Sequence, residues 1–319
     1  MKQGMMALLL LLAECCSAQV KWINTDTAFG ALPGGVHVFK TTDSIDGKPF
    51  IAYYAEARLK DKGLKFTADT TYKRRLTPKM FFEKNEQPLL VVNCTFFNFD
   101  KNQNLNVVIK DGKLVSYNVH TIPGRGKDTF TYRHPFVSAL GITKKRKADV
   151  AWIQADTGTT YAYASQRVLP NYKDSVPQLL LAKILFDTTY FNNLELWKMK
   201  TAVGGGPVLL QNGEIEITNN EELKFTGKAI EDKHPRTCMG YTADGRLIIM
   251  VIQGRSADAA GATLVQEAQL LKDLGCVEAL NLDGGGSSCM LINGKETIKV
   301  SDKEGERPVP AVFIIKTRK

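Results

Sequence analysis

The stretch Asn281-Leu-Asp-Gly-Gly-Gly-Ser-Ser-Cys-Met290 has one carboxylate, three glycines and two hydroxyls at the end of an apolar run. This order predicts a strand that ends in a site. Glycine leaves backbone N–H groups uncovered and lets a ligand or another chain segment approach closely, so Asp283 could lie against an anionic or sugar substrate. A tight turn in which Asp283 caps a helix or loop explains the same residues equally well.

A second glycine triplet, Gly204-Gly205-Gly206, favours the first interpretation. It is followed by Pro207 and the apolar run Val208-Leu-Leu210. Two such triplets in one chain are hard to assign to turns alone. We therefore expect a binding site to which both contribute.

Turn signals between apolar segments predict the fold. Asx-Gly dipeptides accept the positive φ values of tight hairpin turns, and four of them lie between apolar segments of strand composition, at Asp111-Gly112, Asn212-Gly213, Asp244-Gly245 and Asn293-Gly294. Strands are expected at 36–40, 50–57, 89–93, 107–109, 136–141, 208–210, 247–253, 279–282, 289–292 and 312–315. Without a Pro/Gly/Ser-rich linker, residues 19–319 should form a single α+β domain, strand-rich, with a largely antiparallel or mixed sheet and few helices.

Two helices are expected, a weak one around 177–187 and a stronger one over 264–274. The stronger helix has Thr263 as N-cap, Gln266 at the capping-box position and Gly275 past its end. Its apolar stripe includes one carboxylate, Glu267. A carboxylate on a buried face must be paired or hydrogen-bonded, so Glu267 either braces a neighbouring loop or belongs to a pocket.

The composition is that of an ordinary globular protein, with 319 residues, 44% hydrophobic and 24% charged, and a net charge of +9. The excess charge favours anionic partners. Basic runs such as Lys73–Arg75 and Lys144–Lys147 lie in expected loops and form no continuous stripe with aromatic residues, which argues against nucleic acid as a partner.

The N-terminus has the features of a signal peptide. Lys2 precedes an apolar segment with five consecutive leucines, and Cys16-Ser-Ala18 fits cleavage after Ala18. A lipoprotein modified at Cys15 or Cys16 is the second interpretation. The apolar run is too short to span a bilayer, and no later stretch approaches the roughly 20 apolar residues needed. We expect an exported protein, periplasmic or secreted, without a transmembrane segment.

Four cysteines remain after the signal segment: Cys94, Cys238, Cys276 and Cys289. Each has apolar neighbours, so buried free thiols and disulfides are equally compatible with the sequence. No CxxC or His-x-x-x-His spacing indicates zinc. Calcium near Asp283 is possible but not required, and no cofactor is expected.

Polar residues at other strand ends extend the candidate site. Arg236, in His234-Pro-Arg-Thr-Cys-Met-Gly240, and Arg255 both lie at ends of expected strands. A guanidinium group directs two N–H donors toward a carboxylate or phosphate, so the pair could clamp an anion, although a surface salt bridge is the commoner role of an arginine. Asn93 ends another apolar run, before Phe96-Phe97, where it could fix a sugar hydroxyl or close a turn.

These motifs, taken in order, resemble the phosphodiester glycosidase family. The resemblance covers roughly residues 34–315 and rests on Asn93 with Phe96-Phe97, Gly204–Gly213, His234–Thr237, Gly254-Arg255, Thr263 with Glu267, and Asn281–Ser288. The chain departs from the family pattern at Cys94-Thr95, where glycines are usual, and at Gln253, where an acidic residue is frequent.

The resemblance implies hydrolysis of a sugar 1-phosphate diester of the N-acetylglucosamine-phospho-sugar type at the anomeric carbon. Asp283 would be nucleophile or general base, Glu267 the partner carboxylate, and Arg236 and Arg255 the phosphate clamp. Backbone amides of the two triplets, Gly204–Gly206 and Gly284, Gly285 and Gly286, would assist as oxyanion donors. The residues expected to orient sugar and phosphate oxygens are Asn93, His234, Thr237, Asn281 and Ser287.

Two other functions remain compatible with the sequence. A carbohydrate-binding envelope module could keep the pocket without turnover, and a phosphodiesterase could cut the P–O bond instead of the glycosidic bond. A Rossmann fold or P-loop is disfavoured because the chain has no strand-GxGxxG-helix unit and no P-loop lysine.

Overall fold

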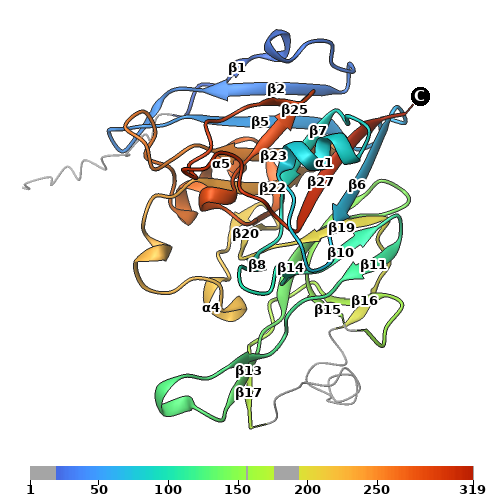
Figure 1. The fold of residues 1–319 in the computed structure, drawn as a ribbon, viewed down its shortest axis with the longest axis vertical. Coiled ribbons are helices and arrows are strands. Elements are labelled where there is room, and N and C mark those ends of the chain that lie inside the picture. Colours follow the sequence, from blue (N-terminus) through green and yellow to red (C-terminus); the bar gives the residue numbers. More distant parts are fainter. Residues whose placement is uncertain (1–18, 156, 176–193, 319) are drawn as a thin grey trace, which may run out of the picture.

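The computed structural model describes residues 19–155, 157–175 and 194–318. Its described strands form three main antiparallel sheets, so the prediction of a strand-rich α+β fold is confirmed (Figure 1). The expected signal peptide and the expected helix around 177–187 lie outside the described residues. None of the helices that the structure describes is long and apolar enough to cross a membrane.

The largest sheet carries the strands on which the candidate site is built. Its eight strands, in spatial order, are β1 (Ile23–Asn24), β2 (Val36–Thr41), β5 (Ala52–Arg58), β23 (Arg246–Ile252), β22 (Arg236–Thr242), β24 (Cys276–Asn281), β20 (Val208–Gln211) and β21 (Glu214–Ile215). The β22–β23 turn at Asp244-Gly245 and the β20–β21 turn at Asn212-Gly213 are two of the four predicted hairpins, which are confirmed.

The second sheet has seven strands: β11 (Lys113–Ser116), β10 (Val108–Lys110), β19 (Thr201–Gly204), β14 (Val137–Ile142), β15 (Ala148–Gln154), β16 (Ala162–Ser165) and β18 (Glu195–Trp197). Its β10–β11 hairpin turns at Asp111-Gly112. Asp111 has a φ of 52° and Gly112 a φ of 84°, the left-handed values that such a turn requires.

The third sheet has five strands: β26 (Lys295–Glu296), β25 (Met290–Ile292), β7 (Leu90–Asn93), β27 (Ala311–Thr317) and β6 (Leu64–Thr70). It includes the fourth predicted hairpin, at Asn293-Gly294. β6 contacts β10 and β19 of the seven-stranded sheet, and Figure 1 shows β27 and β6 above these strands. One apolar cluster, with Val92, Val203, Leu280 and Phe313 among its members, draws on all three sheets and forms the main core.

Smaller elements surround these sheets. The short strands are β3 (Ser44–Ile45), β4 (Lys48–Pro49), β8 (Phe97–Asn98), β9 (Gln103–Asn104), β12 (Ile122–Pro123), β13 (Tyr132–His134) and β17 (Tyr172–Asp174), and the 3-10 helices are η1 (Asp26–Phe29), η2 (Gly126–Asp128), η3 (Gly227–Ile230) and η4 (Gly285–Ser287). β13 and β17 project at the end of the molecule opposite β1 (Figure 1).

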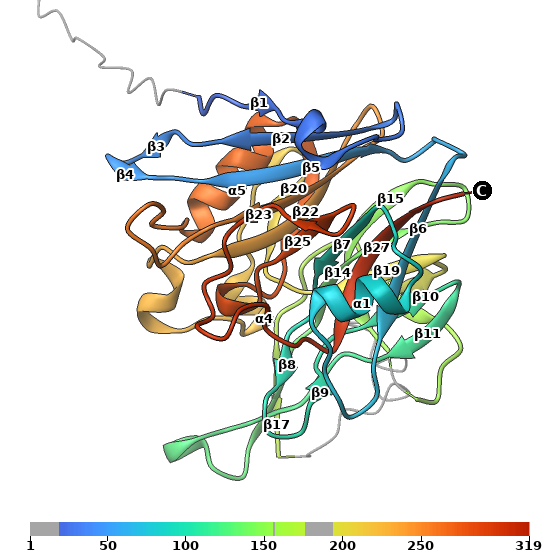
Figure 2. The same cartoon turned by 45° about the horizontal axis from the view of Figure 1, so that its top comes forward.

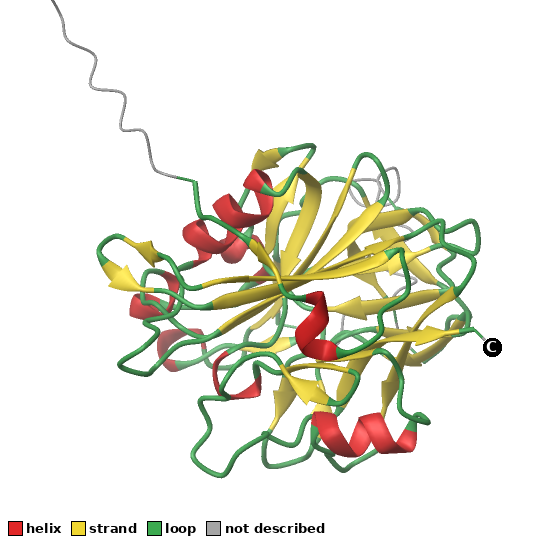
Figure 3. Ribbon diagram, turned by 90° about the horizontal axis from the view of Figure 1, so that it is seen from above, coloured by secondary structure: helices red, strands yellow, loops and turns green. Residues whose placement is uncertain are grey.

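The described α-helices lie outside the strands (Figure 3). α5 (Leu264–Asp273) was predicted, and its capping box is formed by Thr263 and Gln266. Its buried face covers β20 and β24. α1 (Pro78–Lys84), which begins at the N-cap Thr77, packs on β7 and β25 and was not predicted. Figure 2 shows α1 in front of β27, and α4 (Asn219–Glu222) lies below α5.

The four cysteines are buried free thiols. Of the two alternatives left open by the sequence, the structure therefore favours thiols. In the described part of the chain, no group of three or more His, Cys, Asp or Glu side chains could hold a metal ion.

Candidate active site

Asp283 lies two residues beyond the end of β24, and backbone hydrogen bonds fix its position. Its N–H donates to the carbonyl of Cys94 at 2.8 Å, and the N–H of Leu282 donates to the carbonyl of Thr237 at 2.7 Å. The hydrogen bonds of β24 therefore continue for two residues beyond its end. Leu282 bonds to β22, and Asp283 bonds to the segment after β7. The Asp283 side chain leaves the sheet at a fixed point.

Asn93 connects these segments instead of pointing into a cavity. Its Nδ2 donates to the carbonyl oxygen of Asp283 at 2.5 Å, and its Oδ1 accepts from the Thr237 hydroxyl at 3.0 Å and from the Cys289 N–H at 3.1 Å. The side chain is fully buried. Asn93 and Thr237, which we expected to contact substrate oxygens, thus hold the site together in this structure.

The Asp283 carboxyl group has an unusual environment. Burial raises its pKa to about 7, although the nearby Ser287 hydroxyl, the positive charge of Arg307, the Gly284 N–H and the positive charge of Lys224 all act to lower it. Its Oδ2 is buried and has no hydrogen-bond partner among the described residues. A carboxylate in this state can gain or lose a proton near neutral pH, as a general base requires.

Two cations beside Asp283, Lys224 and Arg307, were not anticipated. Burial lowers the pKa of Lys224 to about 8, against the opposing effect of Glu222 and Asp283. Its Nζ lies 4.8 Å from the centre of the Phe96 ring. Arg307 donates from Nε to Asp302 at 2.6 Å, so this ion pair does not use its two terminal nitrogens.

No sequence signal indicated either cation. Lys224 follows α4 and the left-handed residue Leu223, and Arg307 lies in a loop of mixed charge before β27. Neither position lies at the end of an expected strand, which was the feature that identified Arg236 and Arg255. Only the tertiary packing brings them to Asp283.

The triplet Gly284–Gly286 makes room for the arginines. A Cβ on Gly285 would lie 3.3 Å from both terminal nitrogens of Arg255, and a Cβ on Gly286 would collide with the Arg307 guanidinium. The Gly285 N–H donates to the carbonyl of Pro235 at 2.8 Å, so it is not available to an oxyanion. The triplet therefore serves mainly to bring guanidinium groups close to the backbone after Asp283.

The triplet Gly204–Gly206 does not have the expected role. Its three N–H groups donate to the carbonyls of Val107 at 2.8 Å, Ser138 at 3.0 Å and Asn281 at 2.7 Å, and none is free for an anion. The glycines instead permit close packing, because a Cβ on Gly205 would lie 2.5 Å from the carbonyl oxygen of Asn281 and one on Gly206 would collide with the Glu222 carboxylate. The oxyanion donors that we expected here are absent.

Glu222, on α4, anchors this part of the site. Its carboxylate accepts hydrogen bonds from the Ser138 N–H and hydroxyl at 2.9 and 2.8 Å, the Val208 N–H at 2.9 Å and the Thr218 hydroxyl at 2.7 Å. These bonds satisfy the buried charge, as a stable buried carboxylate requires. They also fix the segment that carries Lys224.

Glu267 lies next to Arg236. It is fully buried, neither of its oxygens has a hydrogen-bond partner among the described residues, and burial raises its pKa to about 7 against the opposing charge of Arg236 and the contact with Cys238. The charges acting on Asp283 are instead those of Arg307 and Lys224. The two predicted carboxylates are thus held in different surroundings, with Arg236 beside Glu267.

Arg236 is buried and partly used by the protein. Its Nε donates to the carbonyl of Ala262 at 3.0 Å and its Nη2 to that of Asp232 at 3.4 Å. The Cζ atom of the guanidinium lies 5.7 Å from the centre of the Phe225 ring. Nη1 has no acceptor among the described residues. One guanidinium nitrogen therefore remains available to a ligand.

Arg255 and His234 form an exposed pair beside Arg236. Arg255 has a left-handed φ of 60°, and its Nη2 lies 3.3 Å from Nδ1 of His234. Burial, together with the charges of Arg236 and Arg255, lowers the pKa of His234. These effects favour the neutral form of His234, in which Nδ1 can accept a hydrogen bond from Arg255.

Buried polar atoms without partners gather around Asp283. Within the described residues they include Thr95 Oγ1, Asn281 Oδ1 and Ser287 Oγ in addition to Asp283 Oδ2. Asn281 uses its Nδ2 to donate to the carbonyl of Gly206 at 2.9 Å. Native proteins leave few such atoms unsatisfied, so this concentration is typical of a site that is completed by a ligand.

A cavity of about 260 Å³ opens beside Lys224. Its walls include the rings of Phe96 and Phe225, which are 5.9 Å apart between centroids, and Asn106. Asn106 accepts the Phe96 N–H at 2.9 Å. Aromatic walls beside a cation suit a sugar ring that carries a phosphate.

The fold and this site define a strand-rich α+β protein with a carboxyl group, Asp283, beside the cations Lys224 and Arg307. Its sequence matches the profile of the phosphodiester glycosidase family over residues 87–316. The chain therefore belongs to that family, as the order of its motifs predicted.

Similar sequences match over short segments. The N-acetylglucosamine-1-phosphodiester alpha-N-acetylglucosaminidases of Mus musculus and Homo sapiens are each 33% identical over 94 residues, which is 27% of this chain and 18% of theirs. An uncharacterized prophage-derived protein of Bacillus subtilis is 41% identical over 70 residues, 22% of this chain and 11% of that protein. The matches thus span less than a fifth of the relatives' length.

Solved structures share the fold over most of the chain. The catalytic domain of the zebrafish N-acetylglucosamine-1-phosphodiester alpha-N-acetylglucosaminidase, auto-inhibited by its pro-peptide, has a TM-score of 0.60 at 20% identity and covers 94% of this chain and 89% of that one. A hypothetical protein from Synechocystis has a TM-score of 0.58 at 16% identity, with coverages of 94% and 68%. At these identities the likeness concerns the fold alone.

Proposed function

We propose that this protein hydrolyses sugar 1-phosphate diesters at the anomeric carbon and releases a free sugar and a phosphomonoester. The observation that carries this proposal is the Asp283 carboxyl group, whose pKa is about 7, next to the cations Lys224 and Arg307. Family membership supports the same reaction class. An N-acetylglucosamine-phospho-sugar diester is the substrate type that we propose, by analogy with the named activity of the mouse and human relatives.

The bond changes follow from the arrangement of charges. Either a water molecule, which gives a proton to Asp283, attacks the anomeric carbon, or Asp283 attacks it and a water molecule then hydrolyses the resulting glycosyl ester to release the sugar. In both cases the bond from that carbon to the phosphate oxygen breaks with its electron pair leaving on the phosphate. The second pKa of a phosphomonoester is about 6, so this leaving group departs without an acid to protonate it. Lys224, Arg307 and Arg255 offset the negative charge that develops there.

The remaining residues have supporting roles in this proposal. Phe96 and Phe225 hold the sugar ring in the 260 Å³ cavity. Ser287 and Asn281, with their unpartnered oxygens, contact hydroxyl or phosphate groups. Glu267 is a positioning residue, which lies beside the buried Arg236 guanidinium.

The decisive experiment is turnover of an N-acetylglucosamine-phospho-sugar diester in oxygen-18 water. Cleavage at the anomeric carbon places the label in the released sugar. Label in the phosphate instead would identify a phosphodiesterase that cuts the P–O bond. Binding without any released sugar would identify a carbohydrate-binding module.

Asp283→Asn is the matching variant, because the amide keeps the shape of the side chain and cannot act as nucleophile or base. We expect a loss of kcat by about 10³-fold or more, with unchanged unfolding at low pH. A folded Asp283→Asn protein with the activity of the unaltered protein would refute the assignment.

We also propose that the protein is exported, with cleavage after Ala18. The leucine-rich segment after Lys2 and the small residues before Gln19 support this. N-terminal sequencing of the protein purified from its source should begin at Gln19. A first residue at Cys15 or Cys16, blocked by lipid, would support the lipoprotein alternative.

A further inference from the structure

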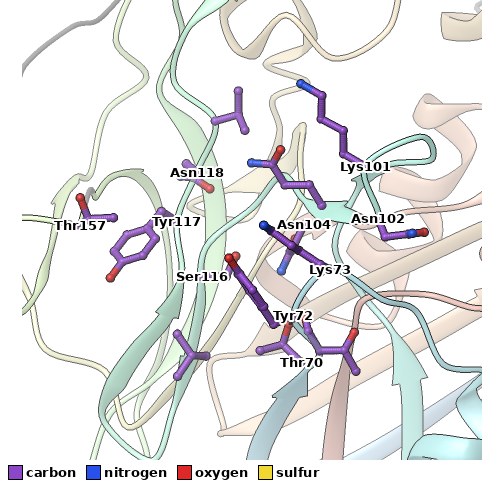
Figure 4. A pocket seen from close by; sticks show the side chains of 14 residues that line it. Thr70, Tyr72, Lys73, Lys101, Asn102, Asn104, Ser116, Tyr117, Asn118 and Thr157 are labelled. Atoms are coloured by element: carbon purple, nitrogen blue, oxygen red, sulfur yellow. Dashed lines mark hydrogen bonds between the residues drawn. The ribbon is translucent and has the colours of Figure 1, made fainter.

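A second cavity, larger than the one beside Lys224, lies apart from Asp283. It has a volume of about 690 Å³ and is bounded by the turn after β6, by β9 and its preceding turn, and by the segment after β11 (Figure 4). The residues that line it include neither glycine triplet nor any side chain assigned to the reaction. It therefore needs a separate explanation.

The cavity is cationic. Of its fourteen lining residues two are lysines, Lys73 and Lys101, and none is acidic. Lys73 Nζ lies 5.2 Å from the centre of the Tyr72 ring, and in the described part of the chain neither lysine forms an ion pair. Two uncompensated ammonium groups in one hollow attract an anion.

The rest of the lining offers neutral hydrogen-bonding groups. Asn104 Nδ2 is buried and has no acceptor among the described residues, while its Oδ1 accepts the Asn106 N–H at 3.1 Å. Figure 4 shows Lys73, Asn104 and Ser116 together at the centre of the cavity, with Lys101 at its rim. Amides and hydroxyls with a tyrosine ring, Tyr72, suit the hydroxyl groups and the apolar face of a sugar.

A series of cation–ring contacts joins this cavity to the candidate active site. The Phe99 ring, 54% exposed, has Arg75 on it at 5.0 Å and Arg307 at 5.4 Å. Arg75 donates from Nε to Asn102 at 2.7 Å, and Asn102 lines the cavity. Arg307 is the arginine whose charge acts on Asp283. Positive charge thus continues from the carboxylate to the cavity.

We propose that this cavity binds a further phosphate-bearing sugar unit of an oligomeric substrate, in which sugars are joined by phosphodiesters. The inference rests on the proposed function and deepens it, because it makes the preferred substrate a polyanionic glycan instead of a single diester. Lys73 and Lys101 contact the phosphate of the distant unit, and Asn104 and Tyr72 contact its sugar. Phe99, with its two arginines, supports the chain between the two positions.

The test compares two substrates, a single sugar-phospho-sugar diester and an oligomer with several phosphodiester-linked repeats. The Lys73→Glu/Lys101→Glu double variant should lower kcat/KM for the oligomer by about tenfold or more, the loss of one charged contact, and leave the single diester unchanged. Lys144→Glu/Lys145→Glu is the matched control, since this exposed pair lies in the β14–β15 turn away from the cavity. It should change neither value.

The outcomes separate this inference from the proposed function. If neither substrate is hydrolysed, the proposed function fails, and calorimetric binding of the oligomer to the unaltered protein and to the lysine variant tests the cavity on its own. Weaker binding in the variant, by about tenfold, supports the cavity as an anionic glycan site. Equal effects of the Lys73/Lys101 change on both substrates, or equal binding of the oligomer by both proteins, would overturn the inference.

Discussion

The Nδ2 atom of Asn93 donates a hydrogen bond of 2.5 Å to the carbonyl oxygen of Asp283, across 190 residues of sequence. Through the same side chain, Thr237 and Cys289 are held to β7. One amide therefore fixes the backbone of the candidate nucleophile relative to two sheets. Its loss should affect both the fold and the reaction.

We expect Asn93→Ala to lower the free energy of unfolding by about 2 to 3 kcal/mol, because it leaves several buried polar groups without partners. Chemical denaturation followed by fluorescence measures this change. Asn220→Ala, at an exposed position of α4, is the control and should stay within about 0.5 kcal/mol of the unaltered protein. A similar small change in Asn93→Ala would show that Asn93 does not hold the site together.

Lys224→Met should move the pH dependence of the reaction. The Lys224 charge lowers the pKa of Asp283, which burial raises to about 7. Without that charge the pKa of Asp283 rises, so the acidic limb of the kcat/KM profile shifts to higher pH, and kcat/KM falls by about 10- to 100-fold. The exposed Lys228, in η3, provides the control variant Lys228→Met.

If the acidic limb of the Lys224→Met profile stays in place, the Lys224 charge does not influence the ionisation of Asp283. A shift to lower pH would contradict the assignment of that limb to Asp283, since removing a cation cannot favour ionisation of a carboxyl group. The Lys228→Met profile should superimpose on that of the unaltered protein.

Glu267→Gln should stabilise the protein at alkaline but not at acidic pH. Burial raises the pKa of Glu267 from its usual 4.5 to about 7, so the folded protein keeps a proton that the unfolded chain releases. The free energy of unfolding therefore falls as the pH rises from about 4.5 through 7, and glutamine removes this dependence. Relative to the unaltered protein, the free energy of unfolding of the variant should be higher at about pH 8 than at about pH 4 by about 2 to 3 kcal/mol.

Denaturation of both proteins over this pH range measures the effect. Glu231→Gln is a control, because the Glu231 side chain is exposed. The free energies of unfolding of Glu267→Gln and the unaltered protein are compared at the acidic and the alkaline pH. If they differ by the same amount at both, Glu267 is not the buried titrating group described above.

The fold was largely predictable from local patterns. Apolar runs and Asx-Gly turns act over a few residues, and they located ten of the strands and all four hairpins. The capping box located α5 for the same reason. α1 was missed because its seven residues are too few for a helical periodicity to emerge.

The site was predictable only in part, because its chemistry depends on contacts between distant segments. Arg236 begins β22 and Asp283 follows shortly after β24, so both could be found from the strand pattern, and the burial of Glu267 followed from its place in the apolar stripe. Whether a backbone N–H is free cannot be read from a glycine triplet. Gly204–Gly206 donate all three to carbonyls of other strands, whereas Gly286 accommodates an arginine from the loop before β27.

The two triplets should therefore respond differently to alanine. Gly206 has a φ of 109° and its Cβ would meet the Glu222 carboxylate and, at 2.6 Å, Lys224, so Gly206→Ala should cost about 3 kcal/mol or more of stability. At Gly286 the three atoms nearest the Cβ all belong to the end of the flexible Arg307 side chain. Gly286→Ala should then change stability by about 1 kcal/mol or less but displace Arg307 and lower kcat by about 10²-fold.

Gly34→Ala is the matched control for both variants, because its Cβ would meet nothing within 4 Å and its φ is not left-handed. Denaturation and kcat are measured for all three proteins. Full activity in a folded Gly286→Ala variant would show that Arg307 is dispensable in the reaction, while loss of folding in that variant would show that the Arg307 guanidinium cannot move. The expected pattern, a stable inactive Gly286→Ala and an unstable Gly206→Ala, assigns the first triplet to packing and the second to the anion site.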